Sequence, residues 1–368
     1  MARLFQDGFE LGRPTGRPAN DSITGLGWLA RRSGAANGIT GVTTNDVRSG
    51  VYCVAMKNDL WGNNPNALGQ ILDAPLTEHY GRVYYRYNHA QGTEFVGLGD
   101  SSNNQLISFR KNSDHDFLVF VDGVQVASVA AGLTMNVYQC VEWRVVISGE
   151  IGLVETRLDG NSVVLWEGDT DVGDSGVQYF WIGSRFTNIG STSLTHRFDD
   201  VAINDTVDDG TENNSWCGPG EIILLKPKAN GDVNEWTRSN DTVNHWELVN
   251  EVPGDGDDTY NYSDEFDEID TYKTEELQAD LLLEPVAGVS NVKAVQLCFT
   301  GRWEGAGADI LPFLRSGAAN QNGDKKAVSS AYDRLQQDTF SRSPFTSQAW
   351  TFADVDALQV GVQHKERV

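Results

Sequence analysis

Cysteine and histidine are scarce in this chain, and neither occurs in a spacing that binds metal. The four cysteines in 368 residues include no C-x-x-C pair. Cys53, Cys140 and Cys298 lie inside apolar, strand-like runs, which favours reduced, buried thiols over a disulfide framework. The six histidines form no H-x-H, H-x-x-H or HExxH spacing, so the sequence contains no local zinc motif.

Long hydrophobic runs and excess positive charge are missing too. The first residues lack the apolar core of a secretory signal and no later stretch is long enough to span a bilayer, so we expect cytoplasmic synthesis and no membrane insertion. The chain has 28 Lys and Arg against 52 Asp and Glu, which gives a net charge of −24. This charge repels phosphate backbones and argues against nucleic acid as a partner. This charge suits solubility at high local concentration, and the alternative interpretation is cation binding.

Helix-forming runs of Ala, Leu, Glu and Lys are few, whereas glycine and large aromatic side chains are common. The 38 Gly and 10 Trp indicate a folded chain of short strands joined by turns. Asp-Gly pairs at 122–123 and 159–160 each separate two apolar runs, which predicts hairpins at 117–129 and 154–166, because Asp-Gly supplies the positive φ angles of tight turns. Residues 141–147 alternate apolar and polar side chains, as a strand with one wet face does.

A polar interruption divides the chain into two parts. Residues 205–215 are polar and lead into a turn-rich stretch that ends at Gly220. We therefore predict an all-β protein of two β-sandwich-type domains, at 1–205 and 221–368, joined by a linker at 206–220. The strands expected in the second domain are 221–226, 292–299 and 357–363.

Three segments of the first half resemble concanavalin A-like, laminin-G-like jelly rolls. They are residues 5–10 (FQDGFE), 154–161 (VETRLDGN) and 197–204 (RFDDVAIN). In that family the first strand returns beside the last, and an Asp-Asp-Val type strand closes the fold. The resemblance implies that the first domain is a concanavalin A-like jelly roll, in which the strand at 5–9 pairs with the strand at 198–203.

The second half is similar to a β domain that recurs in bacteriophage virion proteins. The similarity rests on Trp236, the stretch 245–251, the acidic run 257–260 and the late features at 349–351 and 358–362. It implies a non-enzymatic virion structural protein, a decoration, fibre or baseplate-associated component made in the host cytoplasm and located in the virion. Its implied partners are other virion proteins, copies of itself and host-surface glycan. The alternative, from another class, is a secreted jelly-roll lectin or glucan hydrolase.

Two acidic loops are the candidate metal sites. Asp169, Asp171 and Asp174 stand in one loop, and Asp255 and Asp257 stand in another. Hard oxygen donors in a flexible loop suit calcium, although neither loop has the full twelve-residue ligand pattern with its terminal Glu. The alternative interpretation is a pair of solvated acidic turns.

Aromatic side chains outside strand patterns are the candidate glycan contacts. Trp28, Trp61 and Trp216 lie in Gly/Asn-rich or polar stretches, and we predict that they stand on a jelly-roll rim and stack on sugar rings. Trp143 and Trp181 fall in apolar strand patterns and are predicted to pack in the core.

No catalytic residue is predicted. Jelly-roll glucanases carry E-x-D-x-x-E on one face of a strand, and the nearest match, at 265–270, ends in Asp270 instead of Glu and lies in the second half. No G-x-S-x-G nucleophile elbow is present either. We therefore expect a protein that is not an enzyme and that hydrolyses no β-glucan.

Overall fold

The computed structural model describes most of the chain, and strands dominate it. The described residues are 3–11, 28–32, 40–58, 66–102, 104–171, 176–184, 194–208, 210–252, 254–277, 292–304, 308–330 and 332–367. None of the helices in these ranges is long and apolar enough to cross a membrane.

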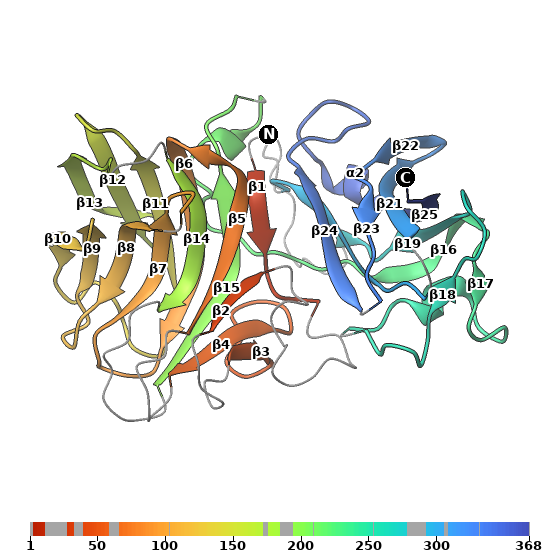
Figure 1. The fold of residues 1–368 in the computed structure, drawn as a ribbon, viewed down its shortest axis with the longest axis horizontal. Coiled ribbons are helices and arrows are strands. Elements are labelled where there is room, and N and C mark those ends of the chain that lie inside the picture. Colours follow the sequence, from red (N-terminus) through yellow and green to blue (C-terminus); the bar gives the residue numbers. More distant parts are fainter. Residues whose placement is uncertain are drawn as a thin grey trace.

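The first half is a sandwich of two antiparallel sheets, which occupies the left of Figure 1. Chain neighbours are often split between the sheets, as in a jelly roll, so the predicted fold class is confirmed. Sheet I has the order β13 (Asn161–Gly168), β12 (Gly152–Leu158), β11 (Gln139–Val146), β6 (Glu78–Tyr87), β15 (Leu194–Asn204), β4 (Cys53–Asn58) and β3 (Thr40–Thr43), and β1 (Arg3–Asp7) also pairs with β15. Sheet II has the order β10 (Val124–Val129), β9 (Phe117–Val121), β8 (Gln105–Lys111), β7 (Thr93–Gly99), β14 (Val177–Ser184), β5 (Asn66–Leu76) and β2 (Leu29–Arg32).

Pairings predicted from the sequence are present in this sandwich. The first strand, β1, pairs antiparallel with β15, placing Phe5 opposite Ile203. Hairpins β9–β10 and β12–β13 turn at the two Asp-Gly pairs, whose four residues all have positive φ angles between 45° and 80°. The predicted pairing of the first and last strands is confirmed, and so are the two predicted hairpins. The hairpins follow from short-range turn chemistry alone.

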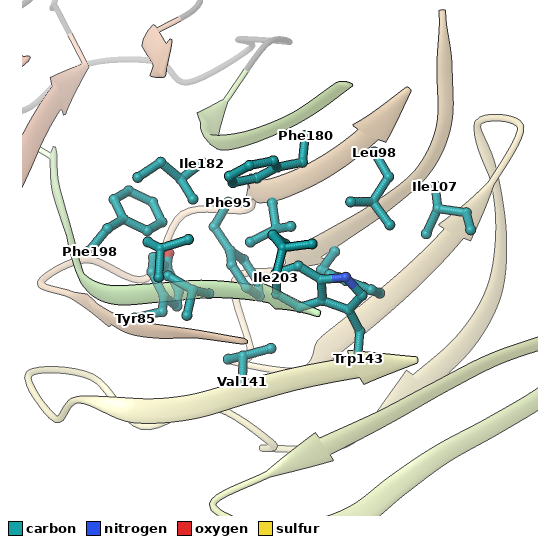
Figure 2. Close-up of a cluster of buried hydrophobic side chains, with 14 of the residues drawn as sticks. Tyr85, Phe95, Leu98, Ile107, Val141, Trp143, Phe180, Ile182, Phe198 and Ile203 are labelled. Carbon is teal, nitrogen blue, oxygen red and sulfur yellow. The ribbon is translucent and has the colours of Figure 1, made fainter. Parts of the chain in front are cut away.

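Large aromatic rings fill the space between the two sheets. Figure 2 shows Tyr85, Phe95 and Trp143 among the aliphatic side chains of this core. The rings of Tyr85 and Phe95 stack at a centroid distance of 4.2 Å. Burying one such side chain contributes roughly 1.5–3 kcal/mol. Trp143 is in this core as predicted, whereas Trp181 is buried on the opposite face of β14 from Phe180.

Three aromatic rings lie flat over a glycine directly opposite them on the neighbouring strand. Trp143 faces Gly81, Trp181 faces Gly97, and a phenylalanine of the second half faces Gly361. A Cβ added to Gly81 would stand 2.1 Å from the Trp143 ring. The glycines therefore provide the space that the rings occupy, which explains glycine in the middle of strands.

Replacing Gly81 with alanine should lower the free energy of unfolding by about 1–3 kcal/mol, because the new methyl group displaces a fully buried indole. Urea denaturation of Gly81→Ala measures the loss. Gly254→Ala is the matched control, since nothing lies within 4 Å of its added Cβ, and it should change the same quantity by less than about 0.5 kcal/mol. Equal effects of the two substitutions would contradict this account.

The second half is built on a smaller antiparallel sheet, sheet III, at the right of Figure 1. Its apolar side chains cluster around the fully buried Trp350 and include Leu358 beside the predicted last strand. Sheet III has the order β16 (Pro227–Asn234), β19 (Ile269–Thr274), β25 (Gln359–Glu366), β21 (Ala308–Ser316) and β22 (Ala319–Asn322), with β23 (Lys326–Ala327) also on β21. Two strand pairs accompany it, β17 (Thr237–Arg238) with β18 (Asn261–Tyr262) and β20 (Val295–Gly301) with β24 (Asp333–Phe340). The described residues also form three short helices, η3 (Glu212–Asn214), η4 (His245–Leu248) and α2 (Phe352–Asp356).

The segment 221–226 is not a strand, which corrects the prediction made from its apolar run. Together with residues 215–220 it crosses the outer, polar face of sheet I. There Gly218 N–H donates to Oε1 of Glu142 at 2.7 Å, and Ile222 N–H donates to Oδ1 of Asp200 at 2.7 Å. Side chains thus satisfy backbone groups that a neighbouring strand would otherwise pair. The boundary at 206–220 itself stays a prediction.

Candidate functional site

Trp28 is not a rim residue. Its side chain is 1% exposed, and its ring packs edge-on against Phe5 and Phe180 at centroid distances of 5.1 and 5.4 Å. The indole Nε1 donates a 2.7 Å hydrogen bond to Oδ2 of Asp7. The prediction that Trp28 stacks on sugar is therefore wrong, because this indole has its polar atom satisfied and no free face.

Trp216 lies half-buried on the outer face of sheet I. The guanidinium carbon of Arg157 is 3.7 Å from the centroid of its ring, and Tyr80 meets the ring edge-on at 5.6 Å. These contacts occupy part of the indole surface, so a sugar contact at Trp216 stays a prediction. Trp61 lies outside the described residues.

The acidic loops proposed for calcium use their carboxylates locally. Asp169 and Asp171 are exposed, and Oδ1 of Asp169 accepts the N–H of Asp171 at 3.0 Å. Asp255 accepts from Thr259, while Asp257 accepts from the Tyr332 hydroxyl and pairs with Arg302. Asp174 lies outside the described residues. Within the described ranges, no three acidic, histidine or cysteine side chains are arranged to hold a metal, so the calcium prediction gains no support.

The near-match to the glucanase motif is not assembled as a carboxylate pair. Asp267 pairs with Lys365, whereas the Asp270 side chain is buried and accepts from the Tyr272 hydroxyl at 2.7 Å. Oδ2 of Asp270 also lies 2.9 Å from Nδ1 of His245. The role of Asp270 is therefore structural, because its carboxylate holds the side chains of His245 and Tyr272 in place.

Four acidic side chains, Asp7, Glu10, Asp199 and Asp200, gather where β1 and β15 meet the turn before β4. Asp200 stands in a bulge of β15 with φ of 48°, a left-handed conformation that aspartate tolerates better than most residues. Its Oδ2 pairs with the Arg48 guanidinium and accepts from the Ser49 hydroxyl at 2.7 Å. Burial, followed by the charge of Asp200, raises the pKa of Asp199 well above the usual carboxyl range. At neutral pH this adjacent pair therefore holds one charge, which Arg48 balances.

Glu10 belongs to the same cluster but also reaches a cleft. Its oxygens accept the N–H groups of Val51 at 2.8 Å and Tyr52 at 3.3 Å. Burial, with a smaller contribution from the charges of Asp200 and Asp7, raises the pKa of Glu10 to about 7, and the two backbone hydrogen bonds oppose the shift. This carboxyl therefore changes its protonation near neutral pH.

The cleft lies between the first half and the segment 221–226. A pocket of about 420 Å³, which we call the Glu10 pocket, is lined by Glu10, Tyr52, Glu221 and Lys226 among others. A larger cavity of about 1,360 Å³ shares the wall formed by Glu10, Glu221 and Lys226 and continues to β18. Val252 also lines both, and its carbonyl accepts from the Tyr52 hydroxyl at 3.3 Å. Such a cleft between two packed units is a common place for a ligand site.

The far end of the cleft carries an aromatic rim that the sequence analysis missed. Among the described residues, the exposed large hydrophobic side chains that are aromatic are Tyr260, Tyr262 and Phe266, at 37%, 43% and 52% exposure. The rings of Tyr260 and Tyr262 lie with centroids 6.0 Å apart, and both line the larger cavity. Phe266 packs against His364 at 4.9 Å. The available signal was two tyrosines spaced by two residues between turn formers, which places both rings on one side of a strand.

A polar network lies beside these rings. Asn261, between the two tyrosines, donates through Nδ2 to the Tyr272 hydroxyl at 2.8 Å and to the His245 carbonyl at 2.9 Å. Its Oδ1 is buried, and no described group donates to it. Asn261 therefore holds η4 and β19 together beside the larger cavity that it lines.

Comparison with known proteins gives structural likeness only. No protein-family model matches the chain, and no curated protein matches it. An endo-β-1,4-glucuronan lyase from the fungus Trichoderma reesei is 13% identical, with 55% of this chain and 95% of the lyase covered and a TM-score of 0.43. The cellulose-induced protein Cip1 is 16% identical, with 59% and 100% covered and a TM-score of 0.41. The catalytic domain of a glycoside hydrolase family 131 protein from Coprinopsis cinerea is 12% identical, with 55% and 94% covered and a TM-score of 0.36.

These findings correct the expected function. Two of the three structures are named for carbohydrate lyase or hydrolase activity and none is a virion protein, so the expectation of a non-enzymatic bacteriophage structural protein is wrong. The resemblance of the second half to virion domains gains no support. Since likeness at this level carries no argument about chemistry, the function has to be argued from the residues of this chain.

Proposed function

We propose that this protein binds a polysaccharide chain in the cleft between its two halves, with Tyr260 and Tyr262 as the platform. The observation that carries the proposal is the pair of exposed rings, with centroids 6.0 Å apart, that line a cavity of about 1,360 Å³. An aromatic face packs against the C–H bonds of a sugar ring while the sugar hydroxyls stay free for hydrogen bonds.

The surroundings of the two rings supply such hydrogen bonds. The Arg302 guanidinium on the cavity wall donates, and the carboxylate of Asp264, which lines the same cavity, accepts. A pair of rings beside a cavity of this size accommodates more than one sugar unit, which favours a polymer over a monosaccharide. The net charge of −24 does not exclude a neutral glycan, because such a ligand carries no charge to be repelled.

The test measures binding to a panel of neutral, uronic and sulfated polysaccharides by affinity electrophoresis and calorimetry. Replacing Tyr260 and Tyr262 together with alanine should weaken binding at least tenfold, equivalent to about 1.4 kcal/mol, because both stacking surfaces are lost. Leu165→Ala, an exposed apolar residue in β13 at the far end of the sandwich, is the control and should leave binding unchanged. Failure of every polysaccharide to bind, or equal effects of the two variants, would contradict the proposal.

A further inference from the structure

We propose that the site at Tyr260 and Tyr262 selects a polysaccharide that carries free amino groups, such as a polymer of glucosamine, over neutral and acidic polysaccharides. The inference rests on the proposed function, because it concerns the same pair of rings. It goes further in assigning the charge of the ligand and the two carboxylates that recognise it.

The segment 258–264 exposes every second side chain, as an extended chain does. Its exposed side chains are Asp258, Tyr260, Tyr262 and Asp264, and the three between them are half-buried. Two residues of chain span at most roughly 7 Å, so each aspartate begins next to a tyrosine. We call these four exposed residues the tyrosine strip. It carries a carboxylate at each end of a pair of aromatic rings.

The half-buried side chains fix the strip from beneath. The Thr259 hydroxyl donates to Oδ2 of Asp255 at 2.7 Å, and Asn261 donates to the Tyr272 hydroxyl at 2.8 Å. The rings and carboxylates therefore stand on an anchored segment, which lowers the entropy lost when a ligand binds.

The carboxylates of the strip are available to a ligand. Within the described ranges, neither Asp258 nor Asp264 has a hydrogen bond or ion pair through its side chain. The neighbouring Asp257, in contrast, lies 2.7 Å from the guanidinium of Arg302, which also pairs with Glu304. The positive charge on this part of the cavity wall is thus already balanced, and the two strip carboxylates are not.

The neighbouring strand brings no positive charge to the strip. β17 places Thr237 opposite Tyr262 and Arg238 opposite Asn261. Residues that pair across antiparallel strands share a face, so Thr237 stands on the side of the tyrosines and Arg238 on the other side. There the Arg238 guanidinium donates to the Val243 carbonyl at 2.6 Å. An acidic polysaccharide on the strip would therefore meet like charges.

A buried histidine on the same cavity wall also favours a ligand with hydrogens to donate. His364 is 4% exposed, and its Nε2 has no partner among the described groups. Its Nδ1 lies 2.9 Å from the Glu265 carbonyl, which can only accept. In the neutral imidazole Nδ1 therefore carries the hydrogen and Nε2 a lone pair, whose partial charge is negative.

An amino sugar matches all of these groups. The C–H bonds of its ring pack on a tyrosine face, while its ammonium group is attracted to a carboxylate and to the face of the second ring. A polymer repeats the ammonium group along its length, so one chain can meet Asp258 and Asp264 together.

The experiment measures binding of the full chain, by calorimetry at low salt, to a glucosamine oligomer and to the same oligomer with its amino groups acetylated. The glucosamine oligomer should bind at least about tenfold more tightly, and added salt should remove most of the difference. Replacing Asp258 and Asp264 together with asparagine should weaken its binding by about three- to tenfold. The acetylated oligomer should bind the same variant within about twofold of the wild type, because it has no charge to lose.

The control is Asp114→Asn combined with Asp122→Asn, which removes two exposed carboxylates beside β9 in the first sandwich. It changes the net charge by the same amount and should bind both oligomers as the wild type does. Equal effects of the two double variants would mean that the net charge of −24 alone attracts the ligand, and would overturn the inference.

The remaining outcomes separate this inference from the proposed function. Equal affinity for the two oligomers, or tighter binding of a uronic or sulfated polysaccharide, overturns the assigned charge and leaves glycan binding at the tyrosines standing. A lysine oligomer of the same charge that binds as tightly as the glucosamine oligomer overturns the choice of a glycan. Absence of binding to every polysaccharide, the glucosamine polymer included, overturns both.

Discussion

Between pH 6.5 and pH 4, the free energy of unfolding should fall by about 1.4 kcal/mol per pH unit for each histidine that the fold keeps neutral. Burial lowers the pKa of His79 from 6.5 to about 4. The unfolded chain therefore takes up a proton at a higher pH than the folded chain does. Stability that is present above pH 6.5 is lost as the pH falls towards 4, about 3 kcal/mol for His79 alone.

Two further buried histidines, His89 and His196, add to this loss through their mutual contact. Nε2 of His89 lies 3.1 Å from Nε2 of His196, a distance that holds one N–H hydrogen atom between the two nitrogens. Protonating both nitrogens would place two hydrogen atoms against each other. Burial, aided by the Lys111 ammonium, lowers the pKa of His89 to about 3 and that of His196 well below its usual value. The Tyr85 hydroxyl, 2.8 Å from Nδ1 of His196, is the neutral partner on the other side.

Comparison of His79→Gln with the wild type isolates the contribution of His79 to the pH dependence of the free energy of unfolding. Glu10 and Asp199 have raised pKa values and act in the opposite direction, since they gain stability as the pH falls, but they are the same in both proteins. Glutamine keeps an acceptor for the Trp143 indole, which donates to His79 at 3.2 Å. Urea denaturation should show the wild type losing about 3 kcal/mol more than the variant between pH 7 and pH 4. Parallel profiles, or an NMR titration of His79 near pH 6.5 in the folded protein, would refute this.

The sequence predicts those features of the fold that neighbouring residues determine. Asp-Gly at 122–123 and 159–160 specifies tight hairpins wherever the rest of the chain lies, and alternation over 141–147 specifies which side of a strand is buried. The pairing of β1 with β15 came from a family resemblance, because no local signal joins strands nearly 200 residues apart.

Long-range partners explain where sequence reasoning fails. Trp28 looks like a surface residue in its Gly-rich stretch, but Asp7 and the rings of the core lie around it. The apolar run 221–226 has the pattern of a strand, yet its N–H groups meet side chains from sheet I. The Glu10 pocket combines four chain segments, so neither its lining nor the electrostatics of Glu10 can be read from spacing in the sequence.

Removing the Arg48 guanidinium should destabilise the protein by about 3–5 kcal/mol, because it leaves the charge of Asp200 buried without its partner. The Asp200 side chain has no exposed surface, and that of Arg48 is 23% exposed. The remaining donors to Asp200, the Ser49 hydroxyl and the Ile222 N–H, carry no charge. The neighbouring Asp199, whose pKa burial raises well above the usual carboxyl range, stays protonated at neutral pH and supplies no compensating charge.

Arg48→Met tests this, and it also removes the stacking of the guanidinium on Tyr84, whose ring centroid is 3.5 Å from the guanidinium carbon. Urea denaturation at pH 7 should show the full loss, and part of it should disappear at lower pH as the carboxyl groups protonate. Adding Asp200→Asn to Arg48→Met should recover a large share, because the unpaired charge is then gone. Lys228→Met, which breaks a surface pair with Glu276, should cost less than about 1 kcal/mol. If Arg48→Met costs no more than Lys228→Met, or if Asp200→Asn gives no recovery, then the acidic cluster is not held together by its charge balance.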